Sequence, residues 1–281
     1  MSALFAFGDS TIDPGNNNGL HTLFRGDHLP YGCDFPNHTP TGRFSNGKIS
    51  TDYIVDMLGI KSLLPAYLDH GINDEDLLTG VSFGAGGSGL DSNTAAFAQV
   101  MNMDTQLEKF EQRLERIRGG VGDAKANNIV KNALFVISSG TNDMLYNAYL
   151  FPARMMQFGS VSSYHDFLLQ NLDAFIQKLY EVGARMIVVV GLPPIGCLPI
   201  EVTINSVMPN PDWLHRFEQT LKGCCRTGML EMGPVCNMHD PTCADLSKYL
   251  FWDAVHLTEA GYKFLAESGI RNLLAYFTGS N

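Results

Sequence analysis

Short apolar runs alternate along this chain with longer stretches in which apolar residues recur every three or four positions. The runs lie at residues 3–7, 80–83, 133–137 and 186–190. An unbroken apolar run that stops at a glycine or a small polar residue is typical of a strand buried on both faces. The pattern therefore predicts four parallel strands.

Three amphipathic stretches predict helices. Thr105 and Glu108 have the spacing of a capping box, and apolar residues follow them at helical spacing up to residue 117. A second apolar stripe runs through 167–179, and a third runs through 262–273 after Thr258, a candidate N-cap. Strands that alternate with such helices predict an α/β fold with a parallel sheet covered on both faces.

Length and charge limit the possible functions. The 281 residues contain no repeat and no linker composition, so we expect one domain over residues 1–281. A net charge of −10 argues against nucleic acid and anionic membrane surfaces as partners. No window reaches the ~18 consecutive apolar residues that a membrane-spanning helix needs.

The cysteines indicate an oxidising compartment. Six are present, at positions 33, 197, 224, 225, 236 and 243. An even number with four members close together favours disulfides over free thiols. The alternative is a zinc site built from Cys236, His239 and Cys243 with Cys224 or Cys225, although this spacing matches no standard finger.

Secretion is compatible with two further features of the sequence. Asn37 begins an N-glycosylation sequon that ends at Thr39. No charged segment followed by an apolar region precedes residue 7, so we expect Met1 to stand where a removed signal peptide ended.

Polar or glycine-rich residues follow each of the four predicted strands. Ser10 follows the first, a glycine-rich segment at 84–89 the second, Asn142 the third and a proline-containing loop at 191–197 the fourth. Because α/β enzymes keep their chemistry at the carboxyl ends of parallel strands, Ser10 is a candidate nucleophile and Asn142 a candidate hydrogen-bond donor. The local alternatives are a turn residue for Ser10, a flexible turn for 84–89 and a helix N-cap for Asn142.

A serine nucleophile needs a histidine base and an acid that orients it. Two Asp-x-x-His patterns offer such a pair: Asp212 with His215, and Asp253 with His256. The second pair precedes an amphipathic helix, so its loop is anchored and we prefer it. The alternative for His256 is a surface residue near a helix start.

Taken in order, these blocks resemble the SGNH/GDSL hydrolases. The sequence FGDS at 7–10, the glycines after the second strand, GTND at 140–143 and Asp-x-x-His at 253–256 match the four blocks of that superfamily. Further runs at 41–48, 191–199, 233–237 and 248–253 resemble the plant GDSL esterase/lipase branch, and together they cover nearly the whole chain.

The resemblance implies a fold, a reaction and a site. The fold is a three-layer α/β/α sandwich of flavodoxin-like type. Ser10 is the nucleophile, His256 the general base and then acid, and Asp253 the residue that orients His256. The oxyanion hole comprises the backbone N–H groups of Ser10 and Gly87 and the side chain of Asn142.

That site implies a secreted carboxylic ester hydrolase, an esterase or lipase. It acts on lipid or other small-molecule acyl esters through an acyl-serine intermediate, with no metal and no organic cofactor. Two alternatives use the same fold: a catalytically impaired accessory or binding protein, and an acyltransferase with the same triad.

The chain departs from the family in two places. Residues 199–223 are fewer than the family has there, so we expect the last strand of a 2-1-3-4-5 sheet to be missing or altered. The fourth strand would then become an edge, and Cys197 would lack a partner. Arg226 replaces a family glycine and would cost ~1 kcal/mol if that position has a positive φ.

Overall fold

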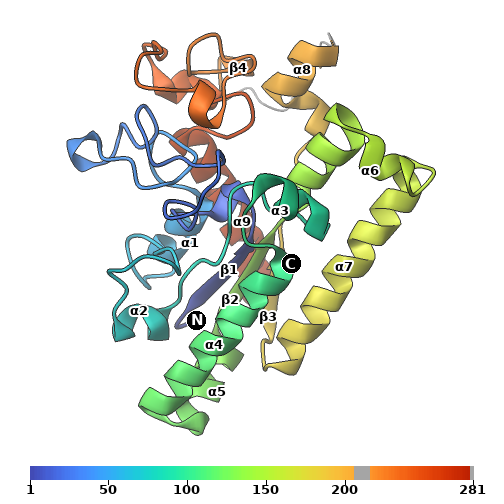
Figure 1. Ribbon diagram of the computed structural model, residues 1–281. Helices are drawn as coiled ribbons and strands as arrows, with labels where there is room; N and C mark the ends of the chain where they lie inside the picture. The colour runs from blue at the N-terminus through green and yellow to red at the C-terminus, as the bar shows by residue number, and fades with distance from the viewer. Residues whose placement is uncertain (206–215, 279–281) are drawn as a thin grey trace. The chain divides into compact units, whose positions relative to one another are not determined.

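The computed structural model describes residues 1–205 and 216–278, which fall into two compact units (Figure 1). The first unit comprises residues 1–24 and 65–195, and the second comprises residues 25–64 and those from 196 on. Each unit is therefore built from two separate stretches of chain. No helix in the described residues has the length and apolar character that crossing a membrane requires.

The first unit contains a parallel three-stranded sheet in the order β1 (Leu4–Gly8), β2 (Leu134–Ser138), β3 (Met186–Val189). Every residue of β1 and β2 is buried, which is why both appear in the sequence as unbroken apolar runs. The predicted parallel α/β architecture is confirmed. Among the described residues no strand pairs with the outer side of β3, so β3 is an edge as expected, and its last residue, Val189, is 42% exposed.

The apolar run at 80–83 does not form the regular strand that its pattern predicts. Ser82 makes isolated parallel bridges to Ala6 on one side and to Ala66 on the other. The segment lies along β1 through hydrogen bonds from the Phe83 N–H to the Ala6 carbonyl oxygen. Gly80 interrupts it with φ +105°, which is outside the strand region and limits the ladder to single bridges.

Helices of the first unit supply the other half of its core. They are α2 (Asp74–Thr79), α3 (Ser92–Ala98), α4 (Met103–Val121), α5 (Asp123–Asn132), a π-helical segment (Asp143–Leu150), α6 (Ala153–Met156) and α7 (Val161–Glu181). Figure 1 shows α4, α5 and α7 alongside the strands. The rings of Phe5 and Phe7 pack on Phe110 of α4 at centroid distances of 5.1 and 5.7 Å, so the predicted apolar stripe of α4 is a core face.

The start of α4 differs from the prediction. The helix begins two residues before Thr105, and its N-cap is Asn102, whose side-chain oxygen accepts from the Thr105 N–H at 2.8 Å. The capping box placed at Thr105 is therefore wrong. Both residues are good N-caps, and the chain enters the helix at the earlier one.

The second unit is built from fewer regular elements. They are α1 (Ser50–Met57), α8 (Pro199–Asn205), β4 (Gln219–Gly223), β5 (Tyr249–Phe251) and α9 (Glu259–Thr278). The strands β4 and β5 pair in parallel as a two-stranded sheet, and α1 packs on α9. The sequence did not predict β4, because its residues are polar and only half-buried except at Gly223. The rival pair Asp212 and His215 lies outside the described residues.

Two disulfides, Cys224–Cys243 and Cys225–Cys236, confirm the expectation from cysteine clustering. Their sulfur atoms are consequently not available as zinc ligands, and the zinc alternative is wrong. Cys197 is a free thiol as expected, and so is Cys33. Arg226 follows the second of the paired cysteines with φ +55°, so the position has the left-handed backbone that favours glycine.

Candidate active site

Ser10 lies one residue beyond Asp9 in the turn that follows β1, and it begins a short 3-10 helix (Ser10–Ile12). The Asp9 carboxylate accepts hydrogen bonds from the Thr11 N–H and hydroxyl at 3.0 and 2.7 Å. Gly8 before it has φ +142°, and a Cβ there would lie 1.7 Å from the carbonyl oxygen of Ser138. Glycine is therefore required where β1 leaves the sheet, and Asp9 has a structural role, because its carboxylate holds the turn.

The glycine-rich segment at 84–89 is a fixed loop beside this turn. The Ala85 N–H donates to the Gly8 carbonyl oxygen at 2.9 Å, and the Gly86 N–H donates to the Asp13 carboxylate at 2.8 Å. Gly87 has φ +86°, and a Cβ there would come within 2.7 Å of the Ala98 methyl carbon. The flexible-turn alternative is therefore wrong, because hydrogen bonds and close packing hold the loop on both sides.

Asn142 follows β2 and points its amide at the glycine-rich loop. Its Nδ2 donates to the Ser88 carbonyl oxygen at 2.8 Å. It occupies the N-cap position of the π-helical segment, as the local alternative had it, but its side chain makes no capping hydrogen bond there. An amide nitrogen has two hydrogens, and within the described part of the chain only one of them is used, which leaves a donor for a substrate oxygen.

Asp143 connects the segment after β2 to the chain that follows the glycine-rich loop through hydrogen bonds. Its buried carboxylate accepts from the N–H groups of Leu90 and Asp91 at 2.7 and 3.0 Å, and the Thr94 hydroxyl also donates to it. Burial raises the pKa of Asp143 to about 6, although these three donors favour the charged form. The sequence analysis did not single out Asp143, because its partners are some fifty residues away and no local pattern marks them.

In the second unit, Asp253 and His256 form a closed turn after β5. One Asp253 oxygen, Oδ1, accepts from the N–H groups of Val255 and His256 at 2.8 and 2.7 Å. The other, Oδ2, lies 2.7 Å from Nδ1 of His256. The three-residue spacing thus lets one carboxylate hold both the backbone and the ring. With Nδ1 protonated toward Asp253, Nε2 carries the lone pair that a general base needs.

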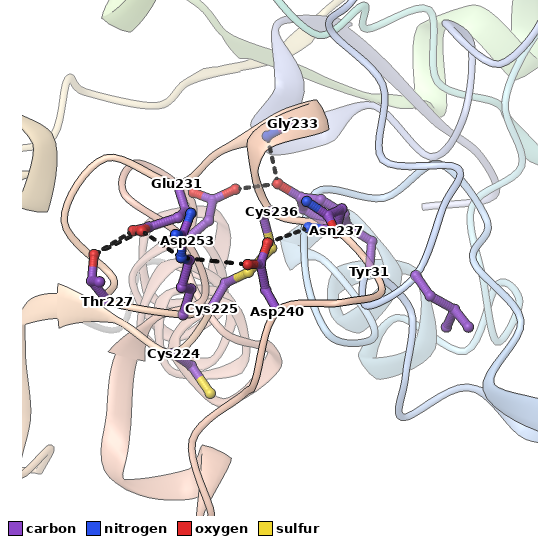
Figure 2. The surroundings of a disulfide bond; sticks show 12 residues. Tyr31, Cys224, Cys225, Thr227, Glu231, Gly233, Cys236, Asn237, Asp240 and Asp253 are labelled. Atoms are coloured by element: carbon purple, nitrogen blue, oxygen red, sulfur yellow. Dashed lines mark hydrogen bonds and ion pairs between the residues drawn. A yellow bond between two sulfur atoms is a disulfide. The ribbon is translucent and has the colours of Figure 1, made fainter.

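Tyr31 and Phe44 complete the surroundings of this pair. The fully buried Tyr31 hydroxyl donates to Asp253 Oδ2 at 2.7 Å, and the Gly233 N–H donates to the Tyr31 oxygen at 2.8 Å, as Figure 2 shows. Burial, and then the nearby Asp253 charge, raise the pKa of Tyr31 well above its usual value. The Phe44 ring stacks on His256 at a centroid distance of 4.8 Å. Sequence reasoning missed both roles, and only the run at 41–48, which includes Phe44, gave any signal.

The loop that holds Gly233 is itself fastened to its surroundings. It is closed by the Cys225–Cys236 disulfide, and its Glu231 carbonyl oxygen accepts from the Ala254 N–H at 2.8 Å (Figure 2). The Glu231 carboxylate accepts from the Thr227 hydroxyl at 2.7 Å. The disulfide therefore supports the backbone on which the Asp253 hydrogen bonds depend.

The structure thus places the sequence-predicted residues in two groups. Ser10, Gly87 and Asn142 lie in linked loops at the carboxyl ends of strands in the first unit. Asp253 and His256 lie in direct contact in the second. Hydrogen bonds join the loops of the first group, and a 2.7 Å contact joins the imidazole and the carboxylate of the second.

Two comparisons with known proteins bear on the family of the chain. The family model for the GDSL-like lipase/acylhydrolase matches residues 4–268. One GDSL esterase/lipase of Arabidopsis thaliana is 42% identical, over 97% of this chain and 90% of its own length. Two more from the same plant are each 38% identical over 94% of this chain, covering 86% and 87% of their own lengths.

The first of these alignments also shows that this chain is internally shorter. It spans 326 positions, 45 more than the 281 residues of the whole chain. The relative therefore has residues within the aligned range that this chain lacks, in agreement with the shortening inferred from the sequence. By family model and by relatives alike, the chain belongs to the GDSL-like lipase/acylhydrolase family.

Proposed function

We propose that this protein is a carboxylic ester hydrolase that acts on lipid or other acyl esters through an acyl-serine intermediate. The observation that carries the proposal is the 2.7 Å contact between His256 Nδ1 and Asp253 Oδ2. It fixes the tautomer in which Nε2 accepts a proton.

In the proposed mechanism, Ser10 Oγ attacks the ester carbonyl carbon while His256 Nε2 takes its proton. The Asp253 carboxylate stabilises the resulting imidazolium without itself becoming protonated. Collapse of the tetrahedral intermediate expels the alcohol, which receives the proton from His256. Water then attacks the acyl-serine with His256 again as base, releasing the acid and restoring Ser10.

The negative charge of the tetrahedral intermediate requires donors placed in advance. The proposed ones are the backbone N–H groups of Ser10 and Gly87 and the amide of Asn142. Each such donor contributes about 10²–10³ in rate, since it meets a charge that the ground state lacks. Gly87 suits this role because its packing allows no side chain between the backbone N–H and a ligand.

We also propose that the chain acts as a single domain over residues 1–281 in an extracellular location. The match to the family model runs from residue 4 to 268 and so draws on residues of both compact units. Two disulfides favour an oxidising compartment. The expected partner is a small-molecule acyl ester.

Ester turnover by the Ser10→Ala variant tests the mechanism. With p-nitrophenyl butyrate, we expect kcat to fall at least about 10³-fold, since loss of a serine nucleophile removes the covalent route. Ser163→Ala, an exposed serine on α7, is the matched control and should retain wild-type kcat. A fluorophosphonate probe should label the wild type and not Ser10→Ala.

Two results would contradict the proposal. Equal turnover by the wild type and Ser10→Ala would exclude Ser10 as nucleophile. A folded wild type that neither hydrolyses esters nor reacts with the probe would favour a catalytically impaired accessory protein. The specific reason to consider that role is the internal shortening relative to the Arabidopsis relative.

A further inference from the structure

Four aromatic rings form a continuous row on the first unit. Phe24 contacts Tyr146 at a centroid distance of 5.9 Å, Tyr146 contacts Phe97 at 6.0 Å, and Phe97 contacts Phe151 at 6.2 Å. They come from three separate parts of the chain: the turn region before residue 25, α3, and the π-helical segment with the residue after it.

The outer end of this row is exposed to an extent that packing does not explain. Phe97 is 62% exposed and Phe151 is 61% exposed, whereas Tyr146 behind them is 7% exposed. Single exposed apolar residues are ordinary on protein surfaces. Neighbouring aromatic rings that remain in contact and open to water on one side are typical of a surface that binds an apolar ligand.

The inner end of the row lies against a proposed oxyanion donor. A Cβ at Gly87 would come within 3.0 Å of the Phe24 ring, so that ring covers Gly87 directly. Phe24 is held there, since its carbonyl oxygen accepts from Asn17 Nδ2 at 2.7 Å. The chain just before Phe24 is held as well, because the Thr22 hydroxyl donates to the Ala98 carbonyl oxygen at 2.6 Å. The row therefore leads from the Cα of Gly87 outward to the exposed rings of Phe97 and Phe151.

We propose that this aromatic row, formed by Phe24, Tyr146, Phe97 and Phe151, is the subsite for the acyl chain of the ester. The inference rests on the proposed function, because that function makes Gly87, at the inner end of the row, a donor to the ester carbonyl oxygen. Ring faces offer apolar contact and no ion-pair partner, so the subsite fits an alkyl chain and not a charged group. Three ring-to-ring steps, each near 6 Å, are far longer than an acetyl group, so the subsite favours long-chain esters such as laurate over acetate.

Phe97 is the position at which to test the subsite. It lies on the open face of α3, so truncation removes ligand contact without opening the core. A methylene fully removed from water contributes about four-fold in binding, and about two-fold when only one side is covered. A ring that covers two or three methylenes should therefore contribute about five- to ten-fold.

The experiment compares kcat/KM for p-nitrophenyl laurate and p-nitrophenyl acetate, below the critical micelle concentration. We expect the laurate-to-acetate ratio to fall about five- to ten-fold in Phe97→Ala. The conservative variant Phe97→Tyr retains the ring face and should retain the ratio. The control is Leu169→Ala on α7, equally exposed at 60% but outside the row, and it should match the wild type.

Each of three results would overturn the inference while leaving the proposed function intact. One is an unchanged ratio in Phe97→Ala. Another is a loss seen only with aggregated substrate, which would mean that the row binds a lipid surface. The third is a wild-type dimer that dissociates in Phe97→Ala with an unchanged ratio, measured by sedimentation, which would make the row a contact between copies. If the wild type hydrolyses neither ester, the proposed function is wrong, and the inference about the acyl subsite is wrong with it.

Discussion

Replacing Tyr31 by Phe removes one oxygen atom from the surroundings of Asp253 and leaves the ring in place. That oxygen makes two hydrogen bonds: it donates to Asp253 Oδ2 at 2.7 Å and accepts from the Gly233 N–H at 2.8 Å. Both bonds are fully buried, because Tyr31 and Asp253 have no exposed surface. The substitution therefore removes a hydrogen-bond donor from the Asp253 carboxylate. It also leaves the backbone N–H of Gly233 without its acceptor.

The cost follows from these two bonds. A hydrogen bond to a charged group contributes about 1.5–3 kcal/mol, and a buried donor without a partner costs about 1–3 kcal/mol. Since the two effects share one site, we expect the free energy of unfolding to fall by about 3 kcal/mol in total. Loss of one charge-assisted bond to Asp253 should also lower kcat/KM about ten-fold, the equivalent of 1.4 kcal/mol.

Activity in the absence of urea separates the positioning of Asp253 from a general loss of stability. If Tyr31 positions the Asp253 carboxylate, kcat/KM falls even where the protein is fully folded. A general loss of stability would lower the urea midpoint and leave kcat/KM of the folded protein unchanged.

The assay is p-nitrophenyl butyrate hydrolysis between pH 5 and pH 9, with urea unfolding of the same samples. Tyr249→Phe is the control, because the Tyr249 hydroxyl makes no hydrogen bond to any residue that the structure describes, and it should leave both measurements unchanged. An unchanged kcat/KM together with an unchanged free energy of unfolding in Tyr31→Phe would refute the reasoning.

Two other variants probe stability. The pKa of Asp143 is raised from 3.8 to about 6, so its protonated form stabilises the fold at low pH and that stability is lost as pH rises through 6. Urea unfolding should show the wild type losing up to about 3 kcal/mol relative to Asp143→Asn between pH 4 and pH 7, and a constant difference would contradict this. Arg226→Gly should gain about 1 kcal/mol by relieving the left-handed backbone. Arg226→Ala loses the same ion pairs with Asp240 and Glu231 but keeps a Cβ on the left-handed backbone, so it should gain nothing.

Much of the fold could be predicted from the sequence, because the patterns that mark its strands and helices lie within short stretches of chain. The strands β1 and β2 are buried on both faces, so their sequences are unbroken apolar runs, and the half-buried edge strand β3 has the same apolar pattern. The strand β4 was not predicted, because its side chains are mostly polar and half-buried. The N-cap of α4 was misplaced by three residues because Asn102 and Thr105 both favour a helix N-terminus.

In the candidate site, too, contacts between residues close in sequence were predictable and contacts between distant residues were not. Asp253 and His256 are three residues apart, and one turn of backbone suffices to bring their side chains together. The order of blocks along the chain was enough to predict the family. The pairing of cysteines was not predictable, since six cysteines allow 15 arrangements and only proximity in space selects among them.

The sequence by itself determined the strand pattern, the family, the candidate nucleophile Ser10 and the acid–histidine pair, because each depends on neighbours along the chain. Only the tertiary structure decided that Tyr31 donates to Asp253 across 222 positions of sequence, and that Phe24 lies over Gly87 at the start of an exposed aromatic row. Contacts between residues so far apart leave no periodicity in the chain. They arise from how the loops pack, and that packing positions Asp253 and shapes the proposed acyl subsite.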